Sequence, residues 1–127
     1  MNIEEILVNA AHSDDKSISY LEQNIFSQKI FEEILCVVES SDIGDARMEG
    51  AFWISKSDNR IIAKNEKRLL NLINEELDSI VVHIMVALSK IKSQEALKMI
   101  IERRVKPVLY WESIALENYF KGETDEI

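Results

Sequence analysis

The chain has 127 residues, of which 46% are hydrophobic and 30% charged, and its formal net charge is −8 at pH 7. We expect residues 1–127 to form one domain, because this length can bury a core without disulfides or a structural metal. Three glycines and one proline are too few for the turns of an all-β chain. The acidity argues against direct nucleic-acid binding, since Lys and Arg supply most of the affinity for phosphate.

Two features of the sequence bear on its surroundings in the cell. No apolar run approaches the roughly 20 residues that span a bilayer, and the opening stretch MNIEEILVNAAHSDD is acidic where a signal peptide is basic. We therefore expect a cytoplasmic protein that does not bind membranes. The single cysteine, Cys36, lies in the apolar run ILCVV, and we expect a buried thiol there.

Helical periodicity predicts about seven helices and no strand. The first helix is expected at about 2–11. A capping box, Ser19 followed three residues later by Glu22, predicts that the second helix begins there and continues to about residue 39. Asp42 is the predicted cap of a third helix that ends near residue 57, and SDNR is the turn after it.

The second half of the chain is predicted to continue in helices. Periodic leucines and isoleucines indicate a helix at about 63–75, and the next two helices are expected to begin at the caps Asp78 and Ser93. Pro107 suits the first turn of a last helix. The acidic stretch GETDEI (122–127) is predicted to be a frayed tail.

Two segments of the chain are similar to each other. MEGAFWISK (48–56) aligns with VHIMVALSK (82–90), which places the ISK of 54–56 on the LSK of 88–90. A second alignment places the Ala-Leu of 87–88 on the Ala-Leu of 115–116. The segments LLNLINEELD and ALKMIIERRV, which lead into the next member of the series, are both amphipathic. Such a recurrence is typical of helical repeats.

The stretch DSIVVHIMVALSKIKSQEALKMI resembles HEAT-like repeats in its order: an Asp, an apolar helix that ends in Ala-Leu, and a polar turn before EAL. The resemblance covers about 30–121 and implies an all-α fold in which antiparallel helix pairs stack into a short right-handed solenoid. One position departs from the family pattern, because the early Arg of the inner helix is present as Arg47 but is Val81 or Val82 in the second unit. Degenerate repeats or a plain helical bundle would explain this departure.

The helix expected at 79–91 is apolar on every side but one. Ser79, His83 and Lys90 lie along a single line on its surface. A helix between two neighbours in a stack buries both flanks and exposes only a narrow strip. We interpret this line as the solvent-facing strip of an inner helix, on a concave face of the solenoid.

The two alignments predict a partner-binding surface on that face. The first alignment pairs the line with Asp45, Glu49 and Lys56, and the second brings Trp111 into it. Carboxylates beside aromatic side chains are typical of protein-binding sites, although core positions are the alternative for Trp53 and Trp111. The predicted partner-binding residues are Asp45, Glu49, Trp53, Ser79, His83 and Trp111.

The sequence contains no recognisable pattern for catalysis or metal binding. His12 and His83 have no second His or Cys at ligand spacing, and no triad can be identified around His83. A glycine-rich phosphate-binding motif is also missing. We therefore expect no enzymatic activity, no catalytic residue, no metal and no cofactor.

In length, acidity and degenerate repeats the chain is similar to the all-α bacterial immunity proteins of contact-dependent growth inhibition and related polymorphic toxin systems. This resemblance implies a monomer that binds the C-terminal domain of a cognate toxin, expected to be a basic nuclease, and occludes its active or substrate-binding site. Charge complementarity would accelerate the association. The alternatives are a helical-repeat adaptor or self-associating homodimer, and an enzyme built on the same repeats.

Overall fold

The structure is a computed structural model of the whole chain, and it describes residues 2–102 and 117–118. These residues contain helices and no strand, which confirms the all-α prediction. Eight helices lie within residues 2–102, one more than the roughly seven expected for the entire chain. They are α1 (Ile3–Ala11), α2 (Asp15–Asn24), α3 (Gln28–Ser40), α4 (Gly44–Ser55), α5 (Asn59–Lys64), α6 (Glu66–Leu70), α7 (Asp78–Lys90) and α8 (Gln94–Ile101).

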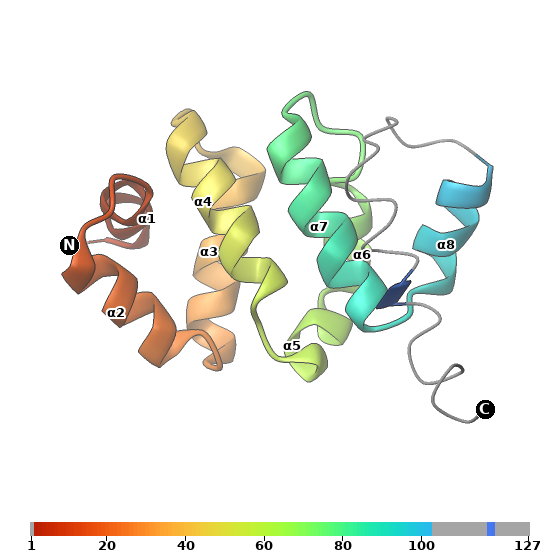
Figure 1. Cartoon of the computed structure of the whole chain (residues 1–127), viewed down its shortest axis with the longest axis horizontal. Helices are drawn as coiled ribbons and strands as arrows, with labels where there is room; N and C mark the ends of the chain where they lie inside the picture. The colour runs from red at the N-terminus through yellow and green to blue at the C-terminus, as the bar shows by residue number, and fades with distance from the viewer. Residues whose placement is uncertain (1, 103–116, 119–127) are drawn as a thin grey trace.

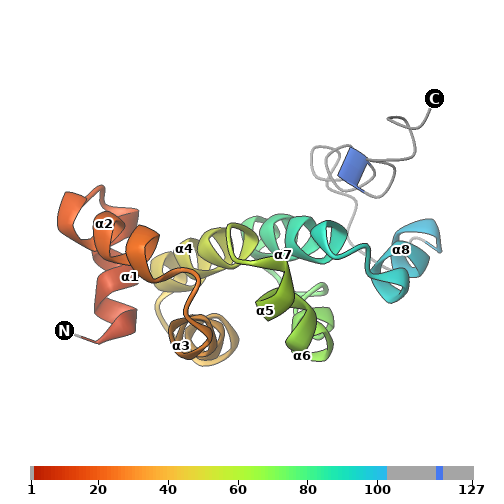
Figure 2. The same cartoon turned by 90° about the horizontal axis from the view of Figure 1, so that it is seen from below.

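The helices are arranged in two layers. Helices α4 and α7 lie side by side with their N-termini at the same end (Figure 1), and α3, α5 and α6 form the layer behind them (Figure 2). Helices α1 and α2 cover one end of this arrangement and α8 lies at the other (Figure 1). Helix α4 is central, because it packs against α1, α3 and α7.

The prediction of a single helix from Ser19 to about residue 39 is wrong, because two helices, α2 and α3, occupy this segment. The Asp14 carboxylate caps α2 by accepting hydrogen bonds from the backbone N–H of Ser17 at 3.1 Å and from its hydroxyl at 2.7 Å. The hydroxyl of Ser27 caps α3 by accepting from the backbone N–H of Ile30 at 3.3 Å. Ser19 therefore lies inside α2, and the capping box predicted there does not begin a helix.

The other predicted caps have mixed outcomes. Helix α4 begins without a side-chain cap, so the cap expected at Asp42 is wrong. Asp78 is the first residue of α7 and does not cap it. Its negative charge there interacts favourably with the positive end of the helix dipole. The Ser93 cap is confirmed, since its hydroxyl accepts a hydrogen bond from the backbone N–H of Ala96 at 3.2 Å.

The helix predicted at about 63–75 is also divided. Helix α5 ends at Lys64 and α6 begins at Glu66, with the buried Asn65 between them. The Asn65 side-chain amide donates to the carbonyl of Ile61 at 2.9 Å, so this buried polar group is satisfied at the break. The predicted last helix, which would begin at Pro107, and the acidic tail lie outside the described residues.

The core lies between the two layers, and at Gly50 helix α4 comes close to α3. A Cβ atom added at Gly50 would lie 2.7 Å from Cγ2 of Val38, so α4 can contact α3 this closely only without a side chain there. The largest fully buried side chains are Phe31, Leu7, Leu21, Ile34, Leu35, Ile54, Ile62, Leu69, Ile73, Ile80 and Ile84.

The prediction of a buried thiol at Cys36 is wrong. Cys36 is exposed, while its neighbours Leu35 and Val37 are buried. Its Sγ lies 3.5 Å from the Nη2 atom of Arg68. The apolar run ILCVV is thus longer than the buried stripe of α3, and the cysteine is the residue of that run that points away from the core.

Helices α4 and α7 correspond in detail. Their first residues, Gly44 and Asp78, fall on each other when 48–56 is aligned with 82–90. In the last turn of each helix a buried serine donates its hydroxyl to the carbonyl three residues before it: Ser55 to Phe52 at 2.5 Å, and Ser89 to Val86 at 2.7 Å. The alignment predicted from the sequence therefore relates two equivalent helices. The right-handed solenoid and the concave face stay predictions.

No helix in the described part of the chain is both long enough and apolar enough to cross a lipid bilayer.

Candidate protein-binding face

The solvent-facing sides of α4 and α7 form one surface, which we call the α4–α7 face. Four residues of α4 and its C-cap residue are partly or fully exposed on this side, and each is aligned with a partly exposed residue of α7. This regularity follows from helix geometry, because positions that are three or four residues apart lie on one side. The residues of the face are Asp45, Met48, Glu49 and Phe52 on α4 with Lys56 directly after it, and Ser79, Val82, His83, Val86 and Lys90 on α7.

Aromatic rings join the two helices at the middle of the face. The ring centroid of Phe52 lies 5.5 Å from that of His83 at an interplanar angle of 84°, and 5.4 Å from that of Trp53 at 83°. Both are edge-to-face contacts, which aromatic rings favour. The ammonium of Lys56 lies 5.5 Å from the centroid of the Phe52 ring, within the range of a cation–π contact.

Trp53 belongs to the core, the alternative that the sequence left open for it. Only 6% of its surface is exposed, and its indole Nε1 donates a hydrogen bond of 2.7 Å to Oε2 of Glu49. This bond satisfies the one polar atom of the buried indole and holds the Glu49 carboxylate in place. The partly exposed aromatic side chain on this face is Phe52, next to Trp53, and not Trp53 as predicted.

Asp45 lies at the N-terminal end of the face. Its carboxylate is 3.3 Å from Nε2 of His12, which follows α1, and the side chains of Asp45 and His12 are 49% and 68% exposed. A contact this exposed contributes little to stability. Asp45 is therefore available at the surface, and it also marks where the face meets the α1–α2 end of the molecule.

The polar strip predicted on α7 is confirmed as a partly exposed line, but its members differ in role. Ser79 is half-buried at the N-terminal end. Burial and, to a smaller extent, the charge of Lys56 lower the pKa of His83 below its ordinary value of 6.5, so the imidazole is neutral at pH 7. Lys90 reaches across to the end of α4 instead of extending into solvent.

Lys90 closes the C-terminal end of α4. Its ammonium donates hydrogen bonds to the carbonyl of Ser55 at 2.8 Å and to that of Ser57 at 2.9 Å. These two carbonyls otherwise lack helical partners. Burial lowers the pKa of Lys90 most, the charge of Lys56 lowers it further, and Asp58 acts in the opposite direction. Lys90 is thus a structural link between the two helices as well as part of their exposed surface.

The structure therefore brings three face residues and the buried Trp53 into one connected group. Glu49 bonds to Trp53, Trp53 contacts Phe52, and Phe52 contacts His83. Asp45 and Ser79 lie on the same face toward its N-terminal end, outside this group. Trp111 lies outside the described residues.

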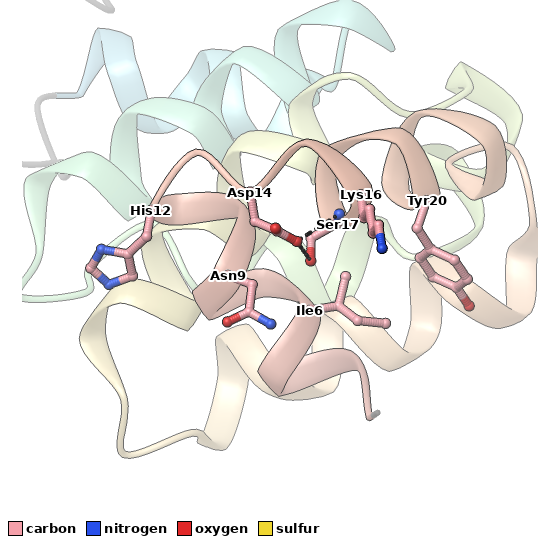
Figure 3. A pocket seen from close by; sticks show the side chains of 7 residues that line it. All are labelled: Ile6, Asn9, His12, Asp14, Lys16, Ser17 and Tyr20. Carbon is pink, nitrogen blue, oxygen red and sulfur yellow. Dashed lines mark hydrogen bonds between the residues drawn. The ribbon is translucent and has the colours of Figure 1, made fainter.

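An open groove that no sequence pattern predicted lies between α1 and α2 (Figure 3). Its volume is about 610 Å³ and its walls are mostly apolar. His12 lies at one end and Tyr20, which is 38% exposed, at the other (Figure 3). The lining residues are Ile6, Asn9, His12, Asp14, Lys16, Ser17 and Tyr20.

The carboxylate in this groove already has a structural role. Hydrogen bonds from the hydroxyl and the backbone N–H of Ser17 lower the pKa of Asp14, because they stabilise its charged form. Asp14 is therefore committed to capping α2. No single residue type could have indicated the groove in the sequence, since it arises from how α1 and α2 meet.

Neither a metal site among the described residues nor a similarity to known proteins indicates a function. The residues that the structure describes contain no group of three or more His, Cys, Asp or Glu side chains placed to hold a metal ion. No protein-family model matches the chain, and comparisons with curated proteins and with solved structures found no match either.

Proposed function

We propose that the chain is an immunity protein whose α4–α7 face binds a basic toxin domain, expected to be a nuclease, and blocks its active or substrate-binding site. The observation that carries the proposal is the exposed stripe of α4 that α7 repeats, with the carboxylates of Asp45 and Glu49 on α4 and a ring contact between Phe52 and His83. A net charge of −8 favours a basic partner and its rapid association.

Glu49 is the best-positioned carboxylate on this face. Its Oε2 atom accepts the indole N–H of Trp53, and its Oε1 atom has no hydrogen-bond partner among the described residues. Because the side chain is already held, binding an Arg or Lys of a partner would cost little additional side-chain entropy. Asp45, one helical turn before it, adds a second negative charge on the same side of α4.

The test is protection of cells against a toxin domain. A candidate toxin domain, taken from a gene beside the one that encodes this chain, would be expressed in bacteria with and without it, and growth would be measured together with the dissociation constant of the purified pair. We expect protection by the wild-type chain. The double variant Asp45→Asn with Glu49→Gln should bind at least about tenfold more weakly, because two charge-assisted contacts are weakened.

A matched control separates a local effect from a general loss of charge. The double variant Glu32→Gln with Glu33→Gln removes the same two charges from exposed positions on α3, in the other layer. It should bind within about twofold of wild type at a salt concentration near 0.15 M, where distant surface charges are largely screened. Equal losses in both double variants would contradict the α4–α7 face as the binding surface. Homodimers without any protection would favour the self-associating scaffold.

A further inference from the structure

Three groups that carry or can acquire positive charge lie close together toward the C-terminal end of the α4–α7 face. Phe52 connects two of them, because the Lys56 ammonium and the His83 ring both lie 5.5 Å from its ring centroid. Lys90 is on the same exposed side of α7 as His83, two helical turns further along. In a chain with a net charge of −8, this end of the face is locally basic.

The polar atoms of this cluster have few partners in the part of the chain that the structure describes. Lys56 forms no ion pair there, and neither imidazole nitrogen of His83 has a hydrogen-bond partner. The nearby carboxylate, Asp58, caps α5 by accepting from the backbone N–H of Arg60 at 3.0 Å. The positive charges are therefore crowded without a counter-charge bonded to them.

Electrostatics supports the same conclusion. After burial, the charge of Lys56 is the next cause that lowers the pKa of His83, and likewise that of Lys90. Like charges held this close disfavour each other, and an anion among them would reverse the sign of the interaction. Lys90 keeps two of its three N–H groups on the end of α4, whereas no polar atom of the Lys56 ammonium or the His83 ring is hydrogen-bonded to a described residue.

We infer that Lys56, His83 and Lys90 form a binding site for an oxyanion, either a carboxylate or a phosphate group. Lys56 and His83 would donate hydrogen bonds to the anion, and Lys90 would add positive potential. This site goes beyond the proposed function and does not depend on it, because the proposed contacts to a basic partner are made by Asp45 and Glu49, toward the other end of the face. On a bound partner, the complementary feature would be an acidic side chain facing the C-terminal ends of α4 and α7.

The site links anion binding to proton uptake. The neutral His83 of the free protein has one ring N–H, whereas the protonated ring has two and a positive charge. An anion binds the protonated form more strongly, so its affinity should rise as the pH falls through the pKa of His83. By linkage the bound anion must raise that pKa toward or above its ordinary value. Lys56 is the charged group that acts on His83, and Lys56 and Asp58 are those that act on Lys90.

Nuclear magnetic resonance can follow the two histidines of the full chain separately. The ring resonances would be titrated between pH 5 and 8 in sodium sulfate, in sodium acetate and in sodium chloride at equal ionic strength. We expect sulfate to raise the pKa of His83 relative to chloride, while the ring of His12 responds equally to both salts. A matching rise in acetate would show that a carboxylate suffices, and a rise in sulfate alone would assign the site to phosphate-like dianions.

Variants of Lys56 make the test specific. Lys56→Gln should raise the pKa of His83 in chloride, since a like charge is removed, and yet should reduce sulfate affinity roughly fivefold. Lys56→Arg should retain the sulfate response. Lys29→Gln, an exposed charge change on α3, should behave as wild type. An equal pKa of His83 in sulfate and chloride, or an unchanged sulfate response in Lys56→Gln, would overturn the inference. Toxin protection is a separate readout, so either proposal can fail alone.

Discussion

The two inner helices, α4 and α7, present equivalent stripes to solvent but pack against the rest of the molecule in different ways. When the two helices are aligned, Gly50 of α4 corresponds to Ile84 of α7, and Trp53 corresponds to Ala87. All four positions are buried. Large and small residues have exchanged places, so each helix fills its part of the core with a different shape.

The helices that pack behind them differ even more. Helix α3 is continuous over 13 residues and buries Phe31 completely. The same alignment pairs Phe31 with Asn65, where the corresponding segment divides into α5 and α6. A buried amide that bonds within its own turn marks this break, whereas an aromatic ring fills the equivalent place in α3.

A third difference is the arginine of the first unit. Arg47 donates through Nε to the carbonyl of Val38 at 2.8 Å, and its Nη2 lies 2.9 Å from Oε1 of Glu75. It thereby connects α4 with α3 and with the segment before α7. The equivalent position in α7 is the fully buried Val81, which cannot make such bonds. The comparison shows that similar outer surfaces can be supported by contacts that are specific to each unit.

Phe31→Asn tests this specificity most severely, because it gives α3 the residue found at the α5–α6 break. We expect a loss of about 4 kcal/mol in the free energy of unfolding, from a cavity and from a buried amide in a continuous helix. Urea unfolding would measure it. The matched control is Phe26→Asn, at a ring that is 68% exposed, which should change stability by less than about 0.5 kcal/mol. Similar losses in both variants would show that Phe31 does not fill the core as described.

Gly50→Ala tests the close approach of α3 and α4. The new methyl group would meet the 2.7 Å contact with Val38, and overpacking should outweigh the better helix propensity of alanine, for a net loss of about 1 kcal/mol. Adding Val38→Ala should recover part of the Gly50→Ala loss in a double-mutant cycle. Gly44→Ala is the control: its Cβ would have nothing within 4 Å, so no loss is expected. Additive effects at Gly50 and Val38 would argue against this contact.

The exposed stripes were predictable because they depend only on helical period. Ser79, His83 and Lys90 were aligned with Asp45, Glu49 and Lys56 from the sequence, and the structure places all six on partly or fully exposed positions. The break between α2 and α3 was not predictable in the same way. Ser and Asp residues that can cap a helix occur several times in this segment, and the apolar period continues across the break through the exposed Phe26.

The details of the site required the tertiary structure for a related reason. Phe52 and Trp53 are adjacent aromatic residues, separated by about 100° around the helix, and both fit an apolar pattern. Which ring is buried depends on how α4 packs against its neighbours, and the buried indole of Trp53 has the acceptor that it needs in the carboxylate of Glu49, one turn earlier. Likewise the contact of Lys90 with the end of α4 joins segments far apart in the sequence, which no local pattern indicates.

The ends of the two inner helices offer the smallest test of the comparison. Helix α4 is closed by the Lys90 side chain, whereas α7 ends in a backbone motif: Ser93 N–H bonds to the carbonyl of Leu88 and Lys92 N–H to that of Ser89, each at 3.0 Å. This motif needs a left-handed residue, and Lys92 has φ of 53°. Glycine adopts that conformation without strain, so Lys92→Gly should stabilise the protein by about 0.5 kcal/mol.

Lys92→Ala is the appropriate comparison, because it removes the same side chain and any interaction it makes while keeping the strain of a Cβ atom. The glycine variant should be about 1 kcal/mol more stable than the alanine variant in urea unfolding. Lys56→Gly and Lys56→Ala make the same comparison at the end of α4. Lys56 follows α4 with φ of −93°, a conformation in which glycine relieves no strain. Alanine should then be at least as stable as glycine. The opposite order at residue 56 would mean that the two helix ends do not differ as the hydrogen bonds indicate.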